Sequence, residues 1–112
     1  MHIQRVAKRF PKLRIVVPHA AWPHTTAICA VAMQCANVHL IPDFYGYIPN
    51  TPGADDYVNA ANYYLGHRLL FASSYPVRPL GQAVEQFRAL PFASDEIRSR
   101  CLGGNAARLL GL

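Results

Sequence analysis

Residues 68–79 read Arg-Leu-Leu-Phe-Ala-Ser-Ser-Tyr-Pro-Val-Arg-Pro, a short apolar run that breaks into small polar residues. The apolar part, residues 69–72, is too short for a helix and is bounded on both sides, which favours a buried strand. Pro76 and Pro79 stop that strand and precede a new helix. In parallel α/β folds, ligands bind at the carboxyl ends of strands. The small polar residues 73–75 therefore occupy a candidate functional edge.

Two further strands are predicted upstream of this stretch. Residues 13–17 and 37–41 are apolar, rich in β-branched side chains, and each is followed by a proline. Helical signals separate the three strands: an amphipathic pattern over 3–10, an alanine-rich segment from Thr25 or Thr26 to about 35, and start signals near Thr51 for a helix to about 65. Strict alternation with long crossovers predicts parallel strands in right-handed βαβ units.

The carboxyl-terminal part of the chain is predicted to be helical. Pro79 opens one helix, and Ser94 is placed to cap a second one. The pair Gly103 and Gly104 is expected to end that helix, and Asn105 to cap a last short turn. The predicted fold class is therefore α/β, with three parallel strands, covering helices and a single domain over residues 1–112.

The length of the chain leaves this sheet incomplete. With 112 residues the chain can bury one modest core. A closed (β/α)₈ barrel takes about 250 residues, so three to four of its units fit here. Three strands cannot close a barrel, and helices on one face would leave the other face bare. We expect further chain or another subunit to cover that face.

Composition excludes several classes of protein. The chain is 52% hydrophobic and 15% charged, which is not the composition of a disordered chain. Its most apolar stretch, residues 27–41, is interrupted by polar side chains and is shorter than the roughly 20 residues of a membrane helix. The amino terminus has no signal-peptide core. We therefore expect no membrane association and a cytoplasmic location.

The charge distribution allows two interpretations. The net charge is +5, and five of the eleven basic residues lie in the first fourteen positions: Arg5, Lys8, Arg9, Lys12 and Arg14. Such a cluster can indicate a polyanionic partner. However, Ile3, Val6 and Phe10 recur at helical spacing, so the basic residues also fit the solvated face of an amphipathic helix. We favour the solvated face and expect no nucleic-acid partner.

The three cysteines, Cys29, Cys35 and Cys101, occur at spacings that match no zinc or redox signature. Cys29 and Cys35 are six residues apart on a predicted helix, which places them on different faces. We expect buried free thiols.

The three strand ends bring together side chains that could bind a metal or take part in catalysis. His19, Asp43 and Ser74 follow the three predicted strands, and Tyr75 lies beside Ser74. A histidine and a carboxylate at neighbouring strand ends are groups that a catalytic divalent metal uses, although two are too few to specify a site. In the alternative interpretation His19 is a hydrogen-bonded structural residue and Asp43 forms a turn.

Four segments of the chain resemble one protein family. They are residues 10–19 (Phe-Pro-Lys-Leu-Arg-Ile-Val-Val-Pro-His), 37–40 (Asn-Val-His-Leu), 68–76 (Arg-Leu-Leu-Phe-Ala-Ser-Ser-Tyr-Pro) and 104–112 (Gly-Asn-Ala-Ala-Arg-Leu-Leu-Gly-Leu). Together they look like the carboxyl-terminal part of the amidohydrolase-related, metal-dependent hydrolases, a TIM-barrel family that includes aminocarboxymuconate-semialdehyde decarboxylase and related decarboxylases. By this resemblance the three strands are the sixth to eighth of the barrel.

The resemblance implies roles for the strand-end residues. His19 holds the position of a histidine that serves at the metal centre as ligand or proton-transfer group. Ser74 stands where a Gly-Ser-Asp-Tyr-Pro motif has its aspartate, and a neutral hydroxyl is a poor ligand and a poor base. We assign catalysis to His19 and Ser74, metal binding to His19, and substrate binding to Asp43 and Tyr75.

The resemblance also implies a cofactor, a divalent zinc or manganese ion. The family's His-x-His on the first strand and its fifth-strand ligand are expected to precede Met1, so we expect this chain alone to bind no metal. The other histidines do not match ligand positions and are expected to be structural or exposed: His2, His24, His39 and His67.

Two functions follow from these observations. In the first, the chain is part of, or a relative of, a metal-dependent hydrolase or decarboxylase acting on a small carboxylated or cyclic substrate, and is inactive in isolation. In the second, it is a non-catalytic interaction or oligomerisation module, in which the bare sheet face or the aromatic loop of residues 44–47 binds another protein or a copy of the chain.

Overall fold

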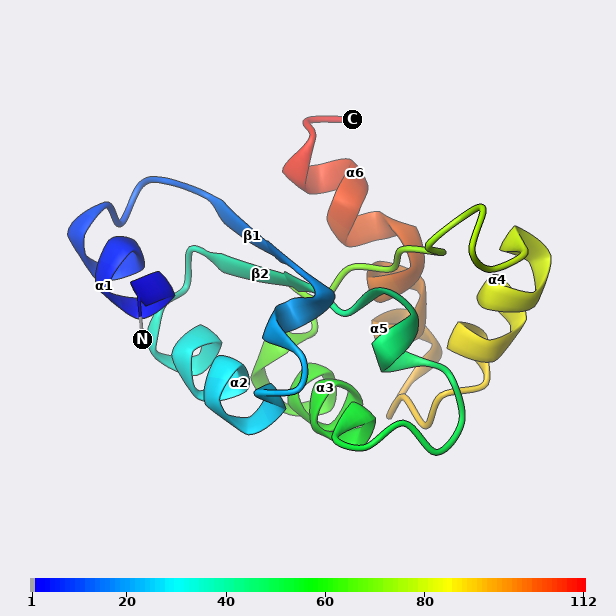
Figure 1. Ribbon diagram of the computed structural model, residues 1–112. Helices are drawn as coiled ribbons and strands as arrows, with labels where there is room; N and C mark the ends of the chain where they lie inside the picture. The colour runs from blue at the N-terminus through cyan, green and yellow to red at the C-terminus, as the bar shows by residue number, and fades with distance from the viewer. Residues whose placement is uncertain (1) are drawn as a thin grey trace.

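A computed structural model of the chain describes residues 2–112 (Figure 1). The regular elements follow one another along the chain as α1 His2–Arg9, β1 Ile15–Pro18, α2 Thr25–Gln34, β2 Val38–Ile41, α3 Ala54–Ala60, α4 Leu80–Arg88, α5 Asp95–Ser99 and α6 Asn105–Leu109. Short helical turns lie between them: η1 His19–Ala21, η2 Asp43–Gly46, and the π-helical turns η3 Ala61–Leu65 and η4 Arg100–Gly104. The α/β fold class is confirmed.

The first two predicted strands form a parallel pair. β1 and β2 are aligned from Ile15 opposite Val38 to Pro18 opposite Ile41, and α2 is the crossover between them. Val38 and Leu40 are fully buried on the face that packs against α2. Figure 1 shows α2 and α3 together on one side of this strand pair.

The prediction of a third regular strand, over residues 69–73, is wrong. The stretch is reduced to one parallel bridge between Leu69 and Leu40, in the part of the chain that is described. The Leu40 N–H donates to Arg68 O at 3.0 Å, and the Leu70 N–H donates to Leu40 O at 2.9 Å. The next residue turns away, because the Phe71 N–H donates to Cys101 O in η4 at 3.0 Å. The stretch still runs parallel to β2, beside the strand pair.

Helix α3 starts later than predicted. Its N-cap is Gly53, whose φ of 81° is in the left-handed region that suits glycine. The Thr51 hydroxyl instead donates to Ile48 O at 2.8 Å. The helix continues through the π-helical turn to Leu65, close to the predicted end.

The threonines at the start of α2 do not cap it, contrary to prediction. His24 is the N-cap residue. The hydroxyls of Thr25 and Thr26 both donate to Oδ2 of Asp56 on α3, so they join the two helices rather than close one of them.

The carboxyl-terminal helices are partly as predicted. Ser94 caps α5 by accepting the Ile97 N–H at 3.1 Å, which confirms that start signal. Gly103 and Gly104 do not end the helix, because η4 leads directly into α6. Asn105 does not act as a cap either: it is buried, and its Nδ2 donates at 2.9 Å to both Gly66 O and Leu69 O. The Asn105 amide thus joins α6 to the bridge segment.

The face of the strand pair that points away from α2 is less covered. Val16 is 37% exposed and Pro18 is exposed, whereas Val17 between them is buried. Along β2, Ile41 is half-buried where Leu40 is fully buried. The alternation shows that the small sheet has one packed face and one open face.

Cys29, Cys35 and Cys101 are free and buried, which confirms the expectation of buried thiols. Within residues 2–112, no helix has both the length and the apolar character needed to cross a membrane.

Candidate active site

His19 and Asp43 lie in contact at the carboxyl ends of β1 and β2. Nδ1 of His19 is 3.0 Å from Oδ2 of Asp43, and the His19 backbone N–H donates to the same oxygen at 2.9 Å. A carboxylate can only accept hydrogen bonds, so Nδ1 carries a proton and the lone pair lies on Nε2. The His19 side chain is 60% exposed, whereas that of Asp43 is 15% exposed. The pair therefore presents a fixed, accessible Nε2.

The backbone is unusual at all three strand ends. His19, Asp43 and Ser74 have φ angles of 55°, 58° and 61°, in the left-handed region. That conformation costs roughly 1–2 kcal/mol for a residue with a side chain. Residues held in such conformations cluster at functional sites, because the surrounding structure must impose them. The three predicted site residues thus share one local geometry.

Ser74 lies in a polar turn that Tyr47 holds. Its Oγ is buried and has no hydrogen-bond partner among the described residues. The Tyr47 hydroxyl donates to Ser73 O at 2.8 Å, and burial raises the pKa of that hydroxyl. Tyr75, in contrast, is exposed, and only its backbone N–H is engaged, donating to Oγ of Ser73 at 3.2 Å. The structure thus leaves Ser74 Oγ buried without a partner and the Tyr75 ring exposed.

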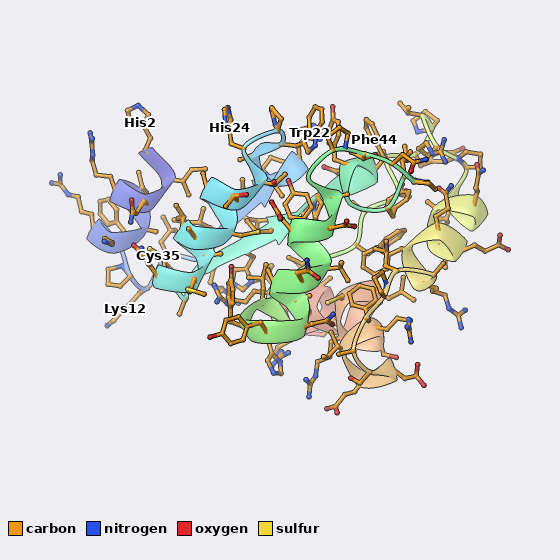
Figure 2. All side chains as sticks on the ribbon, turned by 90° about the horizontal axis from the view of Figure 1, so that it is seen from below. His2, Lys12, Trp22, His24, Cys35 and Phe44 are labelled. Atoms are coloured by element: carbon orange, nitrogen blue, oxygen red, sulfur yellow. The ribbon has the colours of Figure 1, made fainter. Side chains whose placement is uncertain are left out.

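An aromatic stack borders His19. Trp22 and Tyr45 are parallel, with ring centroids 4.4 Å apart, and Phe44 stacks on Tyr45 at 4.3 Å. The His19 ring meets Tyr45 edge-on at 5.6 Å. Figure 2 shows Trp22 and Phe44 close together along one edge of the molecule. The stack borders the His19 ring on one side with an apolar surface.

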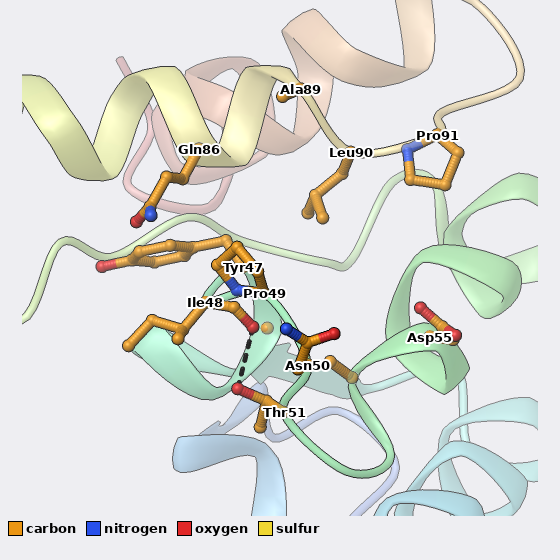
Figure 3. Close-up of a pocket in the computed structure, with 12 residues that line it drawn as sticks. Tyr47, Ile48, Pro49, Asn50, Thr51, Asp55, Gln86, Ala89, Leu90 and Pro91 are labelled. Carbon is orange, nitrogen blue, oxygen red and sulfur yellow. Dashed lines mark hydrogen bonds between the residues drawn. The ribbon is translucent and has the colours of Figure 1, made fainter.

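A separate cavity of about 380 Å³ lies between residues 46–55 and the end of α4. Figure 3 shows Gln86, Leu90 and Pro91 facing the segment that contains Tyr47. Its lining does not include any of the three strand-end residues. Tyr47 is shared, since its ring lines this cavity while its hydroxyl holds the Ser73 turn.

The sequence profile of a family described as amidohydrolase matches residues 1–112. The chain belongs to the amidohydrolase family. No protein of curated function matched the sequence.

Two solved structures resemble this amidohydrolase chain. An uncharacterised TIM-barrel protein from Bordetella bronchiseptica is 42% identical over 98% of the chain, with a TM-score of 0.91. The match covers 38% of that protein. The 5-carboxyvanillate decarboxylase of Sphingomonas paucimobilis is 20% identical over 96% of the chain and 36% of its own length, with a TM-score of 0.64, which shows the fold alone. The chain therefore has the fold of part of a TIM barrel and spans little more than a third of these proteins.

Amidohydrolases are generally metal-dependent, which requires several donor groups around one ion. A catalytic zinc takes three protein ligands and keeps one position open. Among residues 2–112, no group of three or more His, Cys, Asp or Glu side chains is placed to hold a metal ion. Nε2 of His19 suits one ligand, but Asp43 is turned toward Nδ1. The described residues of this amidohydrolase chain do not form a metal site by themselves.

Sequence reasoning did not find every residue around the site. Trp22 was not predicted, and the aromatic residues 44–47 were predicted as a docking surface rather than as neighbours of the strand ends. The left-handed backbone at the strand ends had no signal, because histidine, aspartate and serine do not require it. In this amidohydrolase, tertiary contacts decide these features.

Proposed function

We propose that this chain carries the histidine–aspartate part of the catalytic centre of a metal-dependent hydrolase or decarboxylase that acts on a small carboxylated or cyclic substrate. The observation that supports the proposal best is the contact between Nδ1 of His19 and Oδ2 of Asp43 at 3.0 Å. It orients one imidazole nitrogen toward open space at the end of the strands where enzymes of this fold do their chemistry.

In this proposal His19 is the proton-transfer group. Its Nε2 accepts a proton from water or substrate, or donates one to the product. Asp43 positions the ring and stabilises the imidazolium that forms. Its closeness to the substrate also allows the binding role predicted from sequence.

Ser74 and Tyr75 are proposed to contact the substrate. Ser74 Oγ is buried without a partner, so a substrate oxygen or carboxylate would satisfy it. The exposed Tyr75 ring offers an apolar surface and a hydroxyl beside it. Ser74 is not proposed as a base, since a hydroxyl does not titrate near neutral pH.

The cofactor and the location are extensions of this proposal. We expect zinc or manganese at the complete site, with the ligands supplied by other residues, because Nε2 of His19 cannot bind a metal while it transfers the proton. The three free thiols are consistent with a reducing compartment, which supports a cytoplasmic location.

The test is an assay of the native polypeptide purified from the cells that make it. Release of CO₂ and hydrolysis are measured on a panel of cyclic carboxylates and amides, with zinc or manganese supplied. His19→Asn is expected to lower the turnover by about 10²–10⁴-fold, the usual contribution of a general acid–base group. His24→Asn is the matched control, since His24 is also exposed but outside the strand ends. Full activity in His19→Asn would overturn the proposal.

A second function is favoured by the open sheet face. Val16, 37% exposed, lies on it with Ile41, and such an apolar surface suits self-association of the chain. Sedimentation of the chain across a range of concentrations tests this. A dimer that Val16→Asp dissociates supports the interaction module, whereas a monomer at high concentration contradicts it.

A further inference from the structure

A basic cavity lies at the opposite end of the strands from His19 and Asp43. It has a volume of about 310 Å³ and is lined in part by Arg14, His39, His67 and Arg108. Arg14 directly precedes β1, and His67 precedes the Leu69 bridge, so both stand at the amino ends of their strands. In barrels of this fold the chemistry takes place at the carboxyl ends. The cavity is therefore separate from the candidate active site.

Arg14 and Arg108 each make hydrogen bonds but also keep N–H groups that are free to donate. Nη1 of Arg14 donates to Leu109 O at 2.9 Å. Nη2 of Arg108 lies 3.0 Å from Nδ1 of His67 and donates to Oδ1 of Asn105 at 3.2 Å. A guanidinium has five N–H donors, so each arginine keeps donors that these contacts do not use. Both residues are exposed, which leaves those donors accessible.

The cavity has positive charge without a matching carboxylate. No Asp or Glu is among the residues that line it, in the part of the chain that the structure describes. Arg68, also in the lining, adds a charge while its Nη1 donates to three backbone carbonyls. Partial burial and the neighbouring arginines lower the pKa values of His39 and His67. The site thus has a positive potential that a bound anion would neutralise.

We propose that this cavity binds a small dianionic oxyanion, a phosphate group, between Arg14 and Arg108. The planar donors of arginine match the oxygens of a phosphate, and two arginines balance a charge of two. His67 and His39 also line the cavity and add N–H donors. The charges gather around one open hollow of about 310 Å³ rather than along a surface stripe, which favours a small ligand over a nucleic acid.

The first experiment is calorimetric titration of the full chain with inorganic phosphate at constant ionic strength. We expect saturable binding of one phosphate, weakened about tenfold or more by Arg14→Gln, since a charge-assisted hydrogen bond is lost. Arg88→Gln, on exposed α4 outside the cavity, is the matched control and should leave the affinity unchanged. Absence of binding, or equal loss in both variants, would overturn the proposal.

Further variants separate binding from folding. Circular dichroism shows whether Arg14→Gln is folded, and Arg14→Lys, which keeps the charge but loses the planar fork, should bind with intermediate affinity. Equal binding by Arg14→Gln and the unchanged chain would overturn the assignment. Glycerol 2-phosphate is titrated as well: binding as tight as that of phosphate indicates a phosphate ester as ligand, and weaker binding indicates the free ion. Binding of a short RNA without binding of phosphate would contradict the proposal.

Sulfate provides a test of the histidines, because it keeps both charges over the pH range used. Protonation of His39 and His67 adds charge beside Arg14, Arg68, Arg100 and Arg108, with Glu96 the nearby acidic group. Sulfate affinity should therefore rise between about pH 7.5 and pH 5.5, and His67→Gln should reduce this rise. An affinity that does not change with pH would exclude the two histidines from the site.

Discussion

Oδ2 of Asp43 accepts two hydrogen bonds from one residue, His19: one from its backbone N–H at 2.9 Å and one from its ring Nδ1 at 3.0 Å. The two bonds fix the strand end and the imidazole together. Because both residues have left-handed φ angles, the contact compensates for backbone strain that would otherwise relax. The position of Nε2 is thus built into the fold and does not depend on a ligand.

Asp43→Asn tests this positioning. The amide keeps the shape but can present an N–H to Nδ1, which favours the tautomer with the proton on Nε2. In the native polypeptide we expect a loss of about 10–100-fold in turnover, the usual effect of removing a group that orients an imidazole. Nitrogen NMR of the chain should show the change of tautomer in His19. Asp55→Asn, at an exposed position in the first turn of α3, is the control, and an unchanged tautomer in Asp43→Asn would contradict the role of Asp43.

Arg68 is predicted to stabilise the strand pair. Its Nη1 donates to the carbonyls of Ala32, Cys35 and Val38 at 2.9, 3.0 and 2.9 Å, where α2 ends and β2 begins. Arg68→Met leaves these carbonyls without that donor, so the free energy of unfolding should fall by about 2–4 kcal/mol. Urea unfolding measures the change. Arg88→Met should cost less than about 0.5 kcal/mol, and a similarly small cost for Arg68→Met would contradict the prediction.

The parts of the fold that were predictable are those that local sequence decides. The β-branched runs at 15–18 and 38–41 and the helices around them follow from propensity and periodicity. The reduction of the third predicted strand to one bridge was not predictable, because the hydrogen bond from Phe71 to Cys101 decides where its ladder stops. That contact joins residues thirty positions apart, and no local pattern encodes it.

At the candidate site, too, sequence predicts which residues are neighbours, whereas packing decides their detailed contacts. Parallel strands place their carboxyl ends along one edge, so His19 and Asp43 were predictable as neighbours. Which atoms meet was not predictable, since the left-handed turns that aim them depend on packing. The turn around Ser74 similarly depends on a hydrogen bond from Tyr47, a residue from a different loop.

Stability is predicted to decrease in acid because of His39. Burial, with the charges of Arg68 and Arg14, lowers the pKa of His39 below its ordinary value of 6.5. The unfolded chain therefore binds more protons than the folded chain once the pH falls below that value, and the free energy of unfolding decreases. Urea midpoints should drop between about pH 7.5 and pH 5.5, and less so in His39→Gln. The same slope in His39→Gln and the unchanged chain would exclude His39 as a cause.

The buried thiols are predicted to be unreactive. Burial, with the charge of Asp56, raises the pKa of Cys29 to about 11, and burial raises that of Cys101 to about 12. Because the thiolate is the nucleophile, labelling by a disulfide reagent near pH 8 should be at least about a hundredfold slower than for a free cysteine. All three thiols should react in denaturant, which is the control. Rapid labelling of Cys29 or Cys101 in the folded chain would contradict their burial.

Metal retention by the 112-residue chain is predicted to be low, because its described residues do not form a group of three ligands. After loading with zinc or manganese and dialysis, elemental analysis should find well under one ion per chain. Ser74→Asp adds one carboxylate at the third strand end, but should not restore retention or activity, since the described residues include no group of ligands for it to complete. Retention of one ion per chain that His19→Ala abolishes would contradict this prediction. In that case His19 would be the centre of a site that this chain completes by itself.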